Sequence, residues 1–97
     1  MPPRIPGVNF VEAISRLKSV GWRDDGQSAS HHFLVHPNMP GVRLSVPDHR
    51  GADLSPGTLG SIVVRAGLTR EQFNRLGGSG RRRRARRIRR EVYGMAE

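Results

Sequence analysis

The residues of this sequence best suited to chemistry are its histidines, three of which lie within the ten residues SASHHFLVHP at positions 28–37. A histidine ring has an ordinary pKa of about 6.5, so it can accept or donate a proton near neutral pH. The adjacent pair His31 and His32 is therefore a candidate for general acid–base catalysis. The structural alternative is that both rings fill a half-buried strand and form local hydrogen bonds.

Side-chain alternation along a strand bears on which of the two histidines is accessible. Phe33 and Val35 have the character of an inward face. A period of two then places His31 with them and His32 on the open face with Leu34. Alternation therefore favours His32, but because a residue at the entry of a strand need not follow its alternation, His31 also stays a candidate.

A histidine metal site is not expected. On a strand, His32 and His36 would lie roughly 13 Å apart at about 3.3 Å per residue, which is too far to share one ion. His31 and His32 point to opposite faces, and the sequence has no cysteine and no neighbouring carboxylate to complete a ligand set. We therefore expect no metal and no cofactor.

The charge of the chain favours a polyanionic partner, with nucleic acid first. The formal net charge is +9 and the isoelectric point is about 11.8. Most of the excess lies in residues 81–97, which hold eight arginines against two glutamates. The absence of cysteine excludes disulfides and thiol nucleophiles. The apolar runs are too short for a membrane span or a signal peptide, so we expect a cytoplasmic protein.

The elements that must position the histidines follow from apolar spacing and capping residues. Asn9 with Glu12, and Thr69 with Gln72, have the spacing of capping boxes. Residues 24–30 are polar and small, which is typical of a turn or loop. The pattern predicts a helix at 10–20, strands starting at 22–23, 31 and 42, a helix at 56–66 and a short helix at 70–76. This order indicates an α+β two-layer sandwich, with a three-stranded antiparallel sheet carrying helices on one face.

Three stretches, SHHFLVHP, LSVPDHRGADLSPGTLGSIVVRAGLT and REQFNRL, follow one another at the spacing found in HicA-type (YcfA-like) toxins. The resemblance runs from about Ile5 to Leu76. It implies a fold like that of double-stranded-RNA-binding domains and cleavage of mRNA by a histidine on the second strand. It also implies a HicB-type antitoxin that neutralises the protein.

The resemblance favours His31 as the catalytic residue, with His32 second. RNA is cleaved without metal when a base takes the 2′-OH proton and an acid protonates the leaving 5′-oxygen. The residues expected to bind RNA are Arg23, Ser30, Arg43, His49, Arg81, Arg82, Arg83 and Arg84. His49 is also the best candidate for a partner to His31. The alternative function is a non-catalytic RNA-binding module of the same fold.

The predicted organisation is a ribonuclease domain at residues 5–76, a Gly/Ser linker at 77–80 and an arginine-rich tail at 81–97. Eight like charges within ten residues predict a tail that is disordered when alone. It could still form a helix, because a thin apolar stripe recurs at helical spacing in Ala85, Ile88, Val92 and Met95. Either it is a solvated tail that raises affinity for nucleic acid without specificity, or it folds on RNA, a ribosomal surface or an acidic antitoxin.

Overall fold

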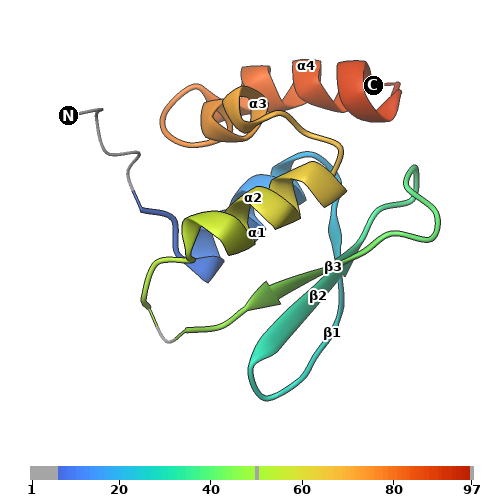
Figure 1. The fold of residues 1–97 in the computed structure, drawn as a ribbon. Helices are drawn as coiled ribbons and strands as arrows, with labels where there is room; N and C mark the ends of the chain where they lie inside the picture. Colours follow the sequence, from blue (N-terminus) through green and yellow to red (C-terminus); the bar gives the residue numbers. More distant parts are fainter. Residues whose placement is uncertain (1–6, 50, 97) are drawn as a thin grey trace.

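The computed structural model describes residues 7–49 and 51–96 and contains one sheet and four helices (Figure 1). The elements are α1 (Phe10–Ser19), β1 (Arg23–Gln27), β2 (His31–Val35), β3 (Arg43–Pro47), α2 (Pro56–Arg65), α3 (Arg70–Arg75) and α4 (Arg81–Tyr93). The three strands form an antiparallel sheet in the order β1-β2-β3. The predicted α+β fold, with a three-stranded antiparallel sheet and helices on one face, is confirmed.

Capping side chains begin the helices where the sequence predicts them. In α3 both halves of the capping box are present, since Thr69 and Gln72 each accept the other's backbone N–H. In α1 the Asn9 side chain accepts from the N–H of Glu12 at 2.9 Å. The Glu12 carboxylate pairs with Arg16 at 3.0 Å instead of closing a second box. Local hydrogen bonding of this kind depends on sequence spacing alone, which is why it is readable in advance.

Strand β1 is longer than predicted, because it includes residues 24–27, which were expected to form a turn or loop. All five of its residues are exposed. Its pairing with β2 shifts register between Asp24 and Gln27. An edge strand is held by main-chain hydrogen bonds on one side only, so polar side chains do not exclude it.

The inward face of β2 is the opposite of the one that alternation predicted. Leu34 is 0 % exposed and lies opposite Leu44, which is also 0 % exposed. His32 shares this inward face, while His31 and Phe33 lie on the open face. The assignment from alternation was wrong because three consecutive apolar residues in β2 fit either face. The choice is made by the partner strand β3, whose apolar residues alternate without ambiguity.

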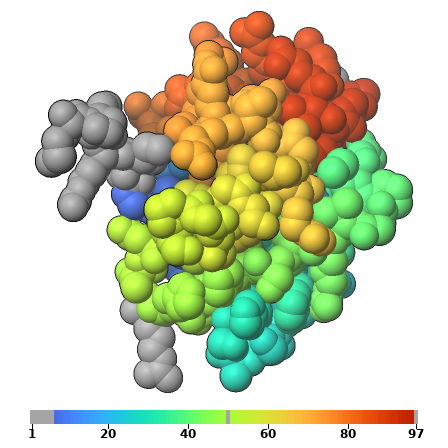
Figure 2. Space-filling view, in the orientation of Figure 1, coloured from blue at the N-terminus to red at the C-terminus, as the bar shows by residue number. Residues whose placement is uncertain are grey.

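The helices form two levels above one face of the sheet (Figure 1). Helices α1 and α2 lie against the sheet and contact β3, and α3 and α4 lie beyond them. The space-filling view shows the same order, with α3 and α4 at one end of the molecule and the strands at the other (Figure 2). The open face of the sheet and the outer side of α4 therefore point in opposite directions.

The segment expected to be disordered forms helix α4, and its apolar stripe packs as the alternative interpretation predicted. Ala85 and Ile88 are buried in the same core as Phe73, and Val92 and Met95 pack against that core. The core thus extends beyond residue 76, where the sequence analysis ended the domain. Burial of the stripe in the core stabilises the helix and offsets the repulsion among the arginines. An isolated helix would lack this burial, so charge density alone predicts disorder. Residues 5, 6 and 97 of the predicted boundaries lie outside the described residues.

Two arginines of α4, Arg84 and Arg89, bond to backbone oxygens at the ends of the helices beneath it. The Arg84 guanidinium donates to the backbone oxygens of Arg75 and Gly77, at the end of α3. Arg89 donates to the Ser19 oxygen at the end of α1, at 2.6 Å. The last carbonyl groups of a helix have no intrahelical donor and carry partial negative charge, so a guanidinium there is favourable.

Tyr93 connects the end of α4 to three distant parts of the chain, at Trp22, at Ala66 and at residues 36–38. Its hydroxyl accepts from Trp22 Nε1 at 2.9 Å and donates to the Ala66 oxygen at 2.7 Å. Its ring stacks on His36 with 4.2 Å between centroids, and its backbone oxygen accepts from the Asn38 amide. Burial raises the pKa of Tyr93 to about 12. The Tyr93 hydroxyl therefore both accepts and donates a hydrogen bond inside the core.

His36 is buried as a neutral ring. It is 4 % exposed, with Nε2 lying 2.9 Å from the Val20 oxygen and Nδ1 accepting from the Asn38 N–H. Because Nδ1 accepts, the single ring proton lies on Nε2 and is donated to Val20. Burial lowers the pKa of His36, and the positive charge of Arg23 acts in the same direction, against the hydrogen bond to Val20.

Acidification should therefore destabilise the protein through His36. The folded-state pKa lies below the ordinary 6.5, so the unfolded chain binds the proton more readily. The stability that the neutral His36 ring contributes is therefore present above about pH 6.5 and is lost as the pH falls towards the pKa of His36 in the folded protein. Urea unfolding at a series of pH values from 8 to 5 measures it. The variant His36→Gln should show a shallower loss over this range, and an equal loss in both proteins would contradict the assignment.

Candidate active site

His31 is the first residue of β2 and lies half-exposed on the open face of the sheet. Its Nδ1 atom is 3.0 Å from Ser30 Oγ. Its ring lies nearly parallel to that of Phe33, with 6.4 Å between centroids. Within the described residues, Nε2 has no hydrogen-bond partner, so this nitrogen is available to a bound molecule.

His32 faces the other way, towards the helices. Its ring stacks on Phe10 of α1 with 5.1 Å between centroids. Its Nε2 atom lies 3.8 Å from Asp48 Oδ2, which is beyond hydrogen-bonding distance but close enough for attraction when the ring is protonated. The two adjacent histidines thus occupy opposite sides of the sheet, and a substrate on the open face meets His31.

The loop after β3 lies beside His31. Pro47 at the end of β3 pairs with His31, and the Asp48 N–H donates to the Ser30 oxygen at 2.8 Å. These contacts hold the start of β2 and the end of β3 together. His49 follows in this loop and is exposed. The structure therefore brings His31, Ser30 and His49 to the same end of the sheet.

Arg23 and Arg43 lie at the opposite end of the sheet. Both pair with Val35, four residues along β2 from His31, which is roughly 13 Å at about 3.3 Å per residue. Arg43 places its guanidinium 4.0 Å from the centroid of the Phe33 ring and forms an ion pair with Asp25 at 2.9 Å. The open face thus carries these two arginines some distance from His31.

Phe33 is a feature of this face that the sequence analysis missed. Its ring lies between the His31 ring and the Arg43 guanidinium, so three flat groups form one row across the sheet. Flat groups of this kind stack with the bases of single-stranded RNA. The signal was available, because a period of two places Phe33 on whichever face holds His31.

The arginines at positions 81–84 are remote from His31. They begin α4, and the level of α1 and α2 lies between α4 and the sheet (Figure 1). Arg81 donates to the Ser15 hydroxyl, and Arg84 bonds the backbone of the α3–α4 connection. Arg82 and Arg83 are exposed. The structure does not bring these four residues together with the other expected RNA-binding residues.

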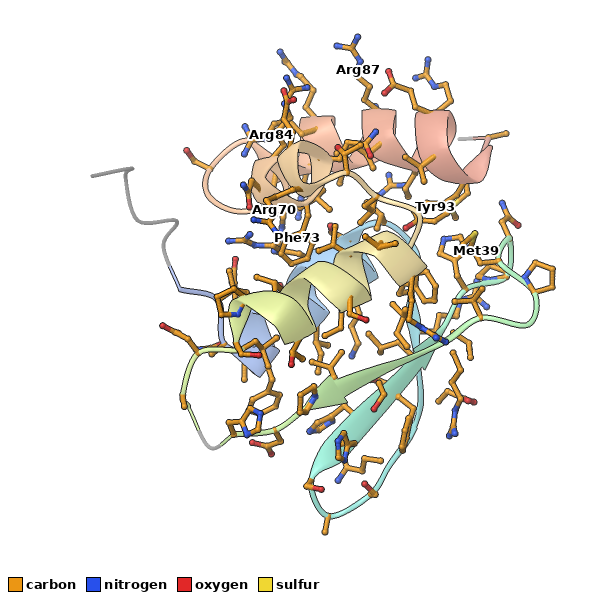
Figure 3. The ribbon with its side chains drawn as sticks, in the orientation of Figure 1. Met39, Arg70, Phe73, Arg84, Arg87 and Tyr93 are labelled. Carbon is orange, nitrogen blue, oxygen red and sulfur yellow. The ribbon has the colours of Figure 1, made fainter. Side chains whose placement is uncertain are left out.

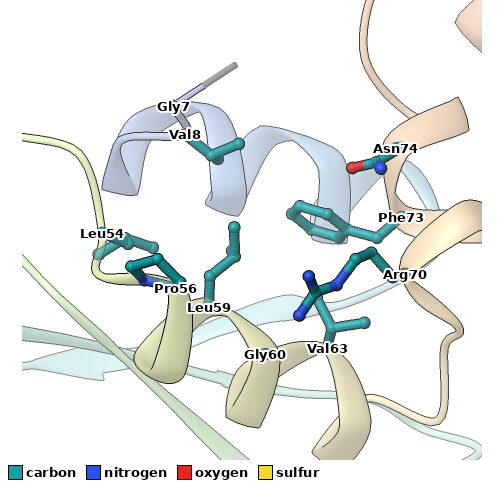
Figure 4. A pocket seen from close by; sticks show the side chains of 10 residues that line it. All are labelled: Gly7, Val8, Leu54, Pro56, Leu59, Gly60, Val63, Arg70, Phe73 and Asn74. Carbon is teal, nitrogen blue, oxygen red and sulfur yellow. The ribbon is translucent and has the colours of Figure 1, made fainter. Parts of the chain in front are cut away.

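The best-formed cavity is not at the histidines. It has a volume of about 100 Å³ and is bordered by α2, by α3 with its polar residues Arg70 and Asn74, and by Val8 and Leu54, which precede α1 and α2 (Figure 4). None of its lining residues is a histidine. Within residues 7–49 and 51–96, no group of three His, Cys, Asp or Glu side chains could hold a metal ion. The histidine site is thus an open surface, which suits a polymeric substrate better than a small molecule.

The chain was compared with models of known protein families. A family model described as the HicA toxin of bacterial toxin–antitoxin systems matches residues 11–68. That range includes β1, β2, β3 and α2, and therefore His31, Ser30 and His49. None of the curated proteins matches the chain. Among the described residues, no helix is both long enough and apolar enough to cross a membrane.

Proposed function

This chain belongs to the HicA toxin family of bacterial toxin–antitoxin systems, and we propose that it is an endoribonuclease that cleaves mRNA by histidine acid–base catalysis. The observation that carries the proposal is the position of His31, on the open face with one ring nitrogen unoccupied. An RNA strand lying across the sheet could reach this nitrogen without any rearrangement of the core.

In the proposed reaction, Nε2 of His31 removes the proton from a ribose 2′-OH. The 2′-oxygen then bonds to the adjacent phosphorus, and the bond from phosphorus to the 5′-oxygen breaks. The leaving oxygen takes a proton from a general acid, for which His49 is the candidate because its loop lies beside the start of β2. The products are a 2′,3′-cyclic phosphate and a 5′-hydroxyl end.

The row formed by His31, Phe33 and Arg43 supplies the binding part of this proposal. A nucleobase next to the cleaved bond would stack on the row, and the Arg43 guanidinium would reach a phosphate. Arg43 already pairs with Asp25 on an exposed surface, where such pairs contribute little. A phosphate can therefore replace the carboxylate at small cost.

Family membership also supports a partner antitoxin of the HicB type and a cytoplasmic site of action. Inhibition by occlusion requires that the antitoxin cover the histidine. We therefore expect the antitoxin to contact the open face near His31 and the loop that carries His49.

The test of the proposal is incubation of purified protein with a labelled RNA in EDTA, which removes the contribution of metal-dependent nucleases. The expected result is cleavage that yields 2′,3′-cyclic phosphate and 5′-hydroxyl ends. Products with 5′-phosphate ends would contradict histidine catalysis of this kind. Binding without cleavage by the folded protein would favour the non-catalytic RNA-binding module instead.

Ser30 should act as a positioning residue for His31. When Nδ1–H donates to Ser30 Oγ, Nε2 is unprotonated and can act as the base. Replacing Ser30 by alanine removes this bond, which is worth about 0.5–1.5 kcal/mol, so the cleavage rate should fall by about 2- to 12-fold. Single-turnover rates with excess enzyme measure the effect.

The conservative variant Ser30→Thr retains the hydroxyl and serves as the matched control. It should restore most of the rate. A rate for Ser30→Ala equal to that of the unchanged protein would show that the ring does not depend on this contact.

A further inference from the structure

The eight arginines of α4 divide into two sets by direction. The inward set bonds to the helices beneath, as described, and consists of Arg81, Arg84 and Arg89. The outward set is exposed and consists of Arg82, Arg83, Arg86, Arg87 and Arg90. Figure 3 shows Arg87 pointing away from the protein, whereas Tyr93 lies on the side of the helix that faces the core. We call the outward set the α4 arginine face.

The α4 arginine face is regular. Arg82, Arg86 and Arg90 follow at intervals of four residues, which is about 6 Å of rise per interval along one side of a helix. Glu91 is the only acidic residue between positions 81 and 93, and it pairs with Arg87 at 2.9 Å. Arg82, Arg83 and Arg90 have no ion-pair or hydrogen-bond partner within the described residues. Three of the five arginines of the face therefore carry a positive charge that no described residue neutralises.

The residue type indicates what the face recognises. All eight basic residues of α4 are arginine and none is lysine. A guanidinium binds a phosphate group through two parallel hydrogen bonds, whereas an ammonium acts as a point charge. Simple solubility would be served equally well by lysine. The whole chain prefers arginine, with Lys18 its only lysine, so the residue type makes phosphate oxygens a suitable ligand, and the clustering on α4 is what distinguishes this face.

The fold maintains this face against its own repulsion. Like charges four residues apart destabilise a helix, and Arg82, Arg86 and Arg90 form two such pairs. The buried Ala85, Ile88 and Tyr93 hold the helix in place in spite of that repulsion. A polyanion that bound along the face would relieve the repulsion and would meet a helix that is already folded, so no ordering would oppose binding.

We propose that the α4 arginine face is a second RNA-binding surface, separate from the site of cleavage, which holds a distant stretch of the same RNA. The inference extends the proposed function, since it takes RNA as the substrate. Helices α1 and α2 separate the two surfaces, and the protein measures 35 × 35 × 20 Å along its principal axes. An RNA that reaches both must span about ten nucleotides, at about 3.4 Å per stacked nucleotide.

The experiment compares long and short RNA. The variant carries Arg82→Gln, Arg83→Gln, Arg86→Gln and Arg90→Gln, in a His31→Ala background that prevents cleavage. Arg87 stays because it pairs with Glu91, and glutamine keeps helix propensity close to that of arginine. Affinity for an unstructured RNA of 30 nucleotides and for one of 5 nucleotides is measured over a series of salt concentrations.

The expected result depends on length. With the long RNA, the slope of log affinity against log salt should become shallower by about 3. This figure assumes that each of the four substituted arginines loses one phosphate contact, worth roughly 0.7 in slope. The short RNA cannot reach both surfaces. Its slope should therefore change by less than about 0.7, the value expected for one phosphate contact. A control variant with Lys18→Gln, Arg70→Gln and Arg75→Gln removes three exposed charges outside the face, two of which, Lys18 and Arg75, are in ion pairs. The changes in slope are compared per charge removed.

Four outcomes overturn the inference. The first three are an unchanged slope with the long RNA, an equal change per charge in the control variant, and the absence of RNA binding by the folded protein. A variant that binds RNA normally but loses affinity for the antitoxin would assign the face to the antitoxin, which also overturns it. The assay requires no cleavage, so a failure of the proposed ribonuclease activity would appear separately, as an intact RNA in the cleavage experiment.

Discussion

Replacement of His31 by alanine should lower the rate of RNA cleavage by about 10²- to 10⁴-fold, the usual contribution of a general acid–base group. The reason is the position of its unoccupied ring nitrogen on the open face of the sheet. Because the ring is half-exposed on the open face, beside Phe33 and Ser30, its removal should leave the fold intact. Single-turnover cleavage measures the rate, and thermal unfolding confirms that the variant is folded.

The matched control is His32→Ala, which removes the adjacent ring on the other side of the sheet. That ring packs on Phe10 and lies near Asp48, so its loss should affect stability more than chemistry. If RNA bound instead to the other face of β2, His32→Ala would lose the cleavage rate and His31→Ala would keep it. A large loss of rate in His32→Ala, with an active and folded His31→Ala, would contradict the assignment.

Replacement of Tyr93 by alanine should destabilise the protein by about 3–5 kcal/mol, the range for removal of a large buried aromatic side chain. Tyr93 is 5 % exposed and stacks on His36. Its loss also leaves Trp22 Nε1 and the Ala66 oxygen without their partner inside the core. Equilibrium unfolding in urea, followed by tryptophan fluorescence, measures the change directly at Trp22.

The variant Tyr93→Phe separates the ring from its hydroxyl. It keeps the stacking and loses only the two hydrogen bonds, so the loss should be about 1–3 kcal/mol. If Tyr93→Ala cost less than Tyr93→Phe, or less than about 1 kcal/mol, α4 would not belong to the cooperative core. That result would restore the view of residues 81–97 as an independent tail.

Local signals in the sequence predicted the elements, and partner strands decided their orientation. The caps at Asn9 and Thr69 and the strands of residues 31–35 and 43–47 follow from spacing alone. The inward face of β2 does not follow from spacing alone. Phe33, Leu34 and Val35 are all apolar, so which of them is buried depends on the pairing with β3. Such a run requires knowledge of the neighbouring strand.

The arginine-rich segment shows a second limit of sequence reasoning. Charge density predicted disorder for residues 81–97, while the apolar stripe through Ala85 and Ile88 predicted a helix. The structure contains the helix, because the stripe meets an apolar surface formed by elements that precede it by up to seventy residues. The hydrogen bonds from Arg84 and Arg89 to helix ends are equally non-local in origin.

The hydrogen bond between Trp22 and Tyr93 joins residues 71 positions apart, so it cannot form until translation has passed residue 93. A ribosome that has completed the sheet still holds the segment that closes the core. The residues from 77 to 93 take about 1–3 s to translate at about 5–20 residues per second, and they must then clear the exit tunnel. During that interval the strand bearing His31 is present without its full support. Full stabilisation of the open face that carries His31 therefore follows the translation of α4, so synthesis of the sheet and acquisition of the stable fold are separated in time.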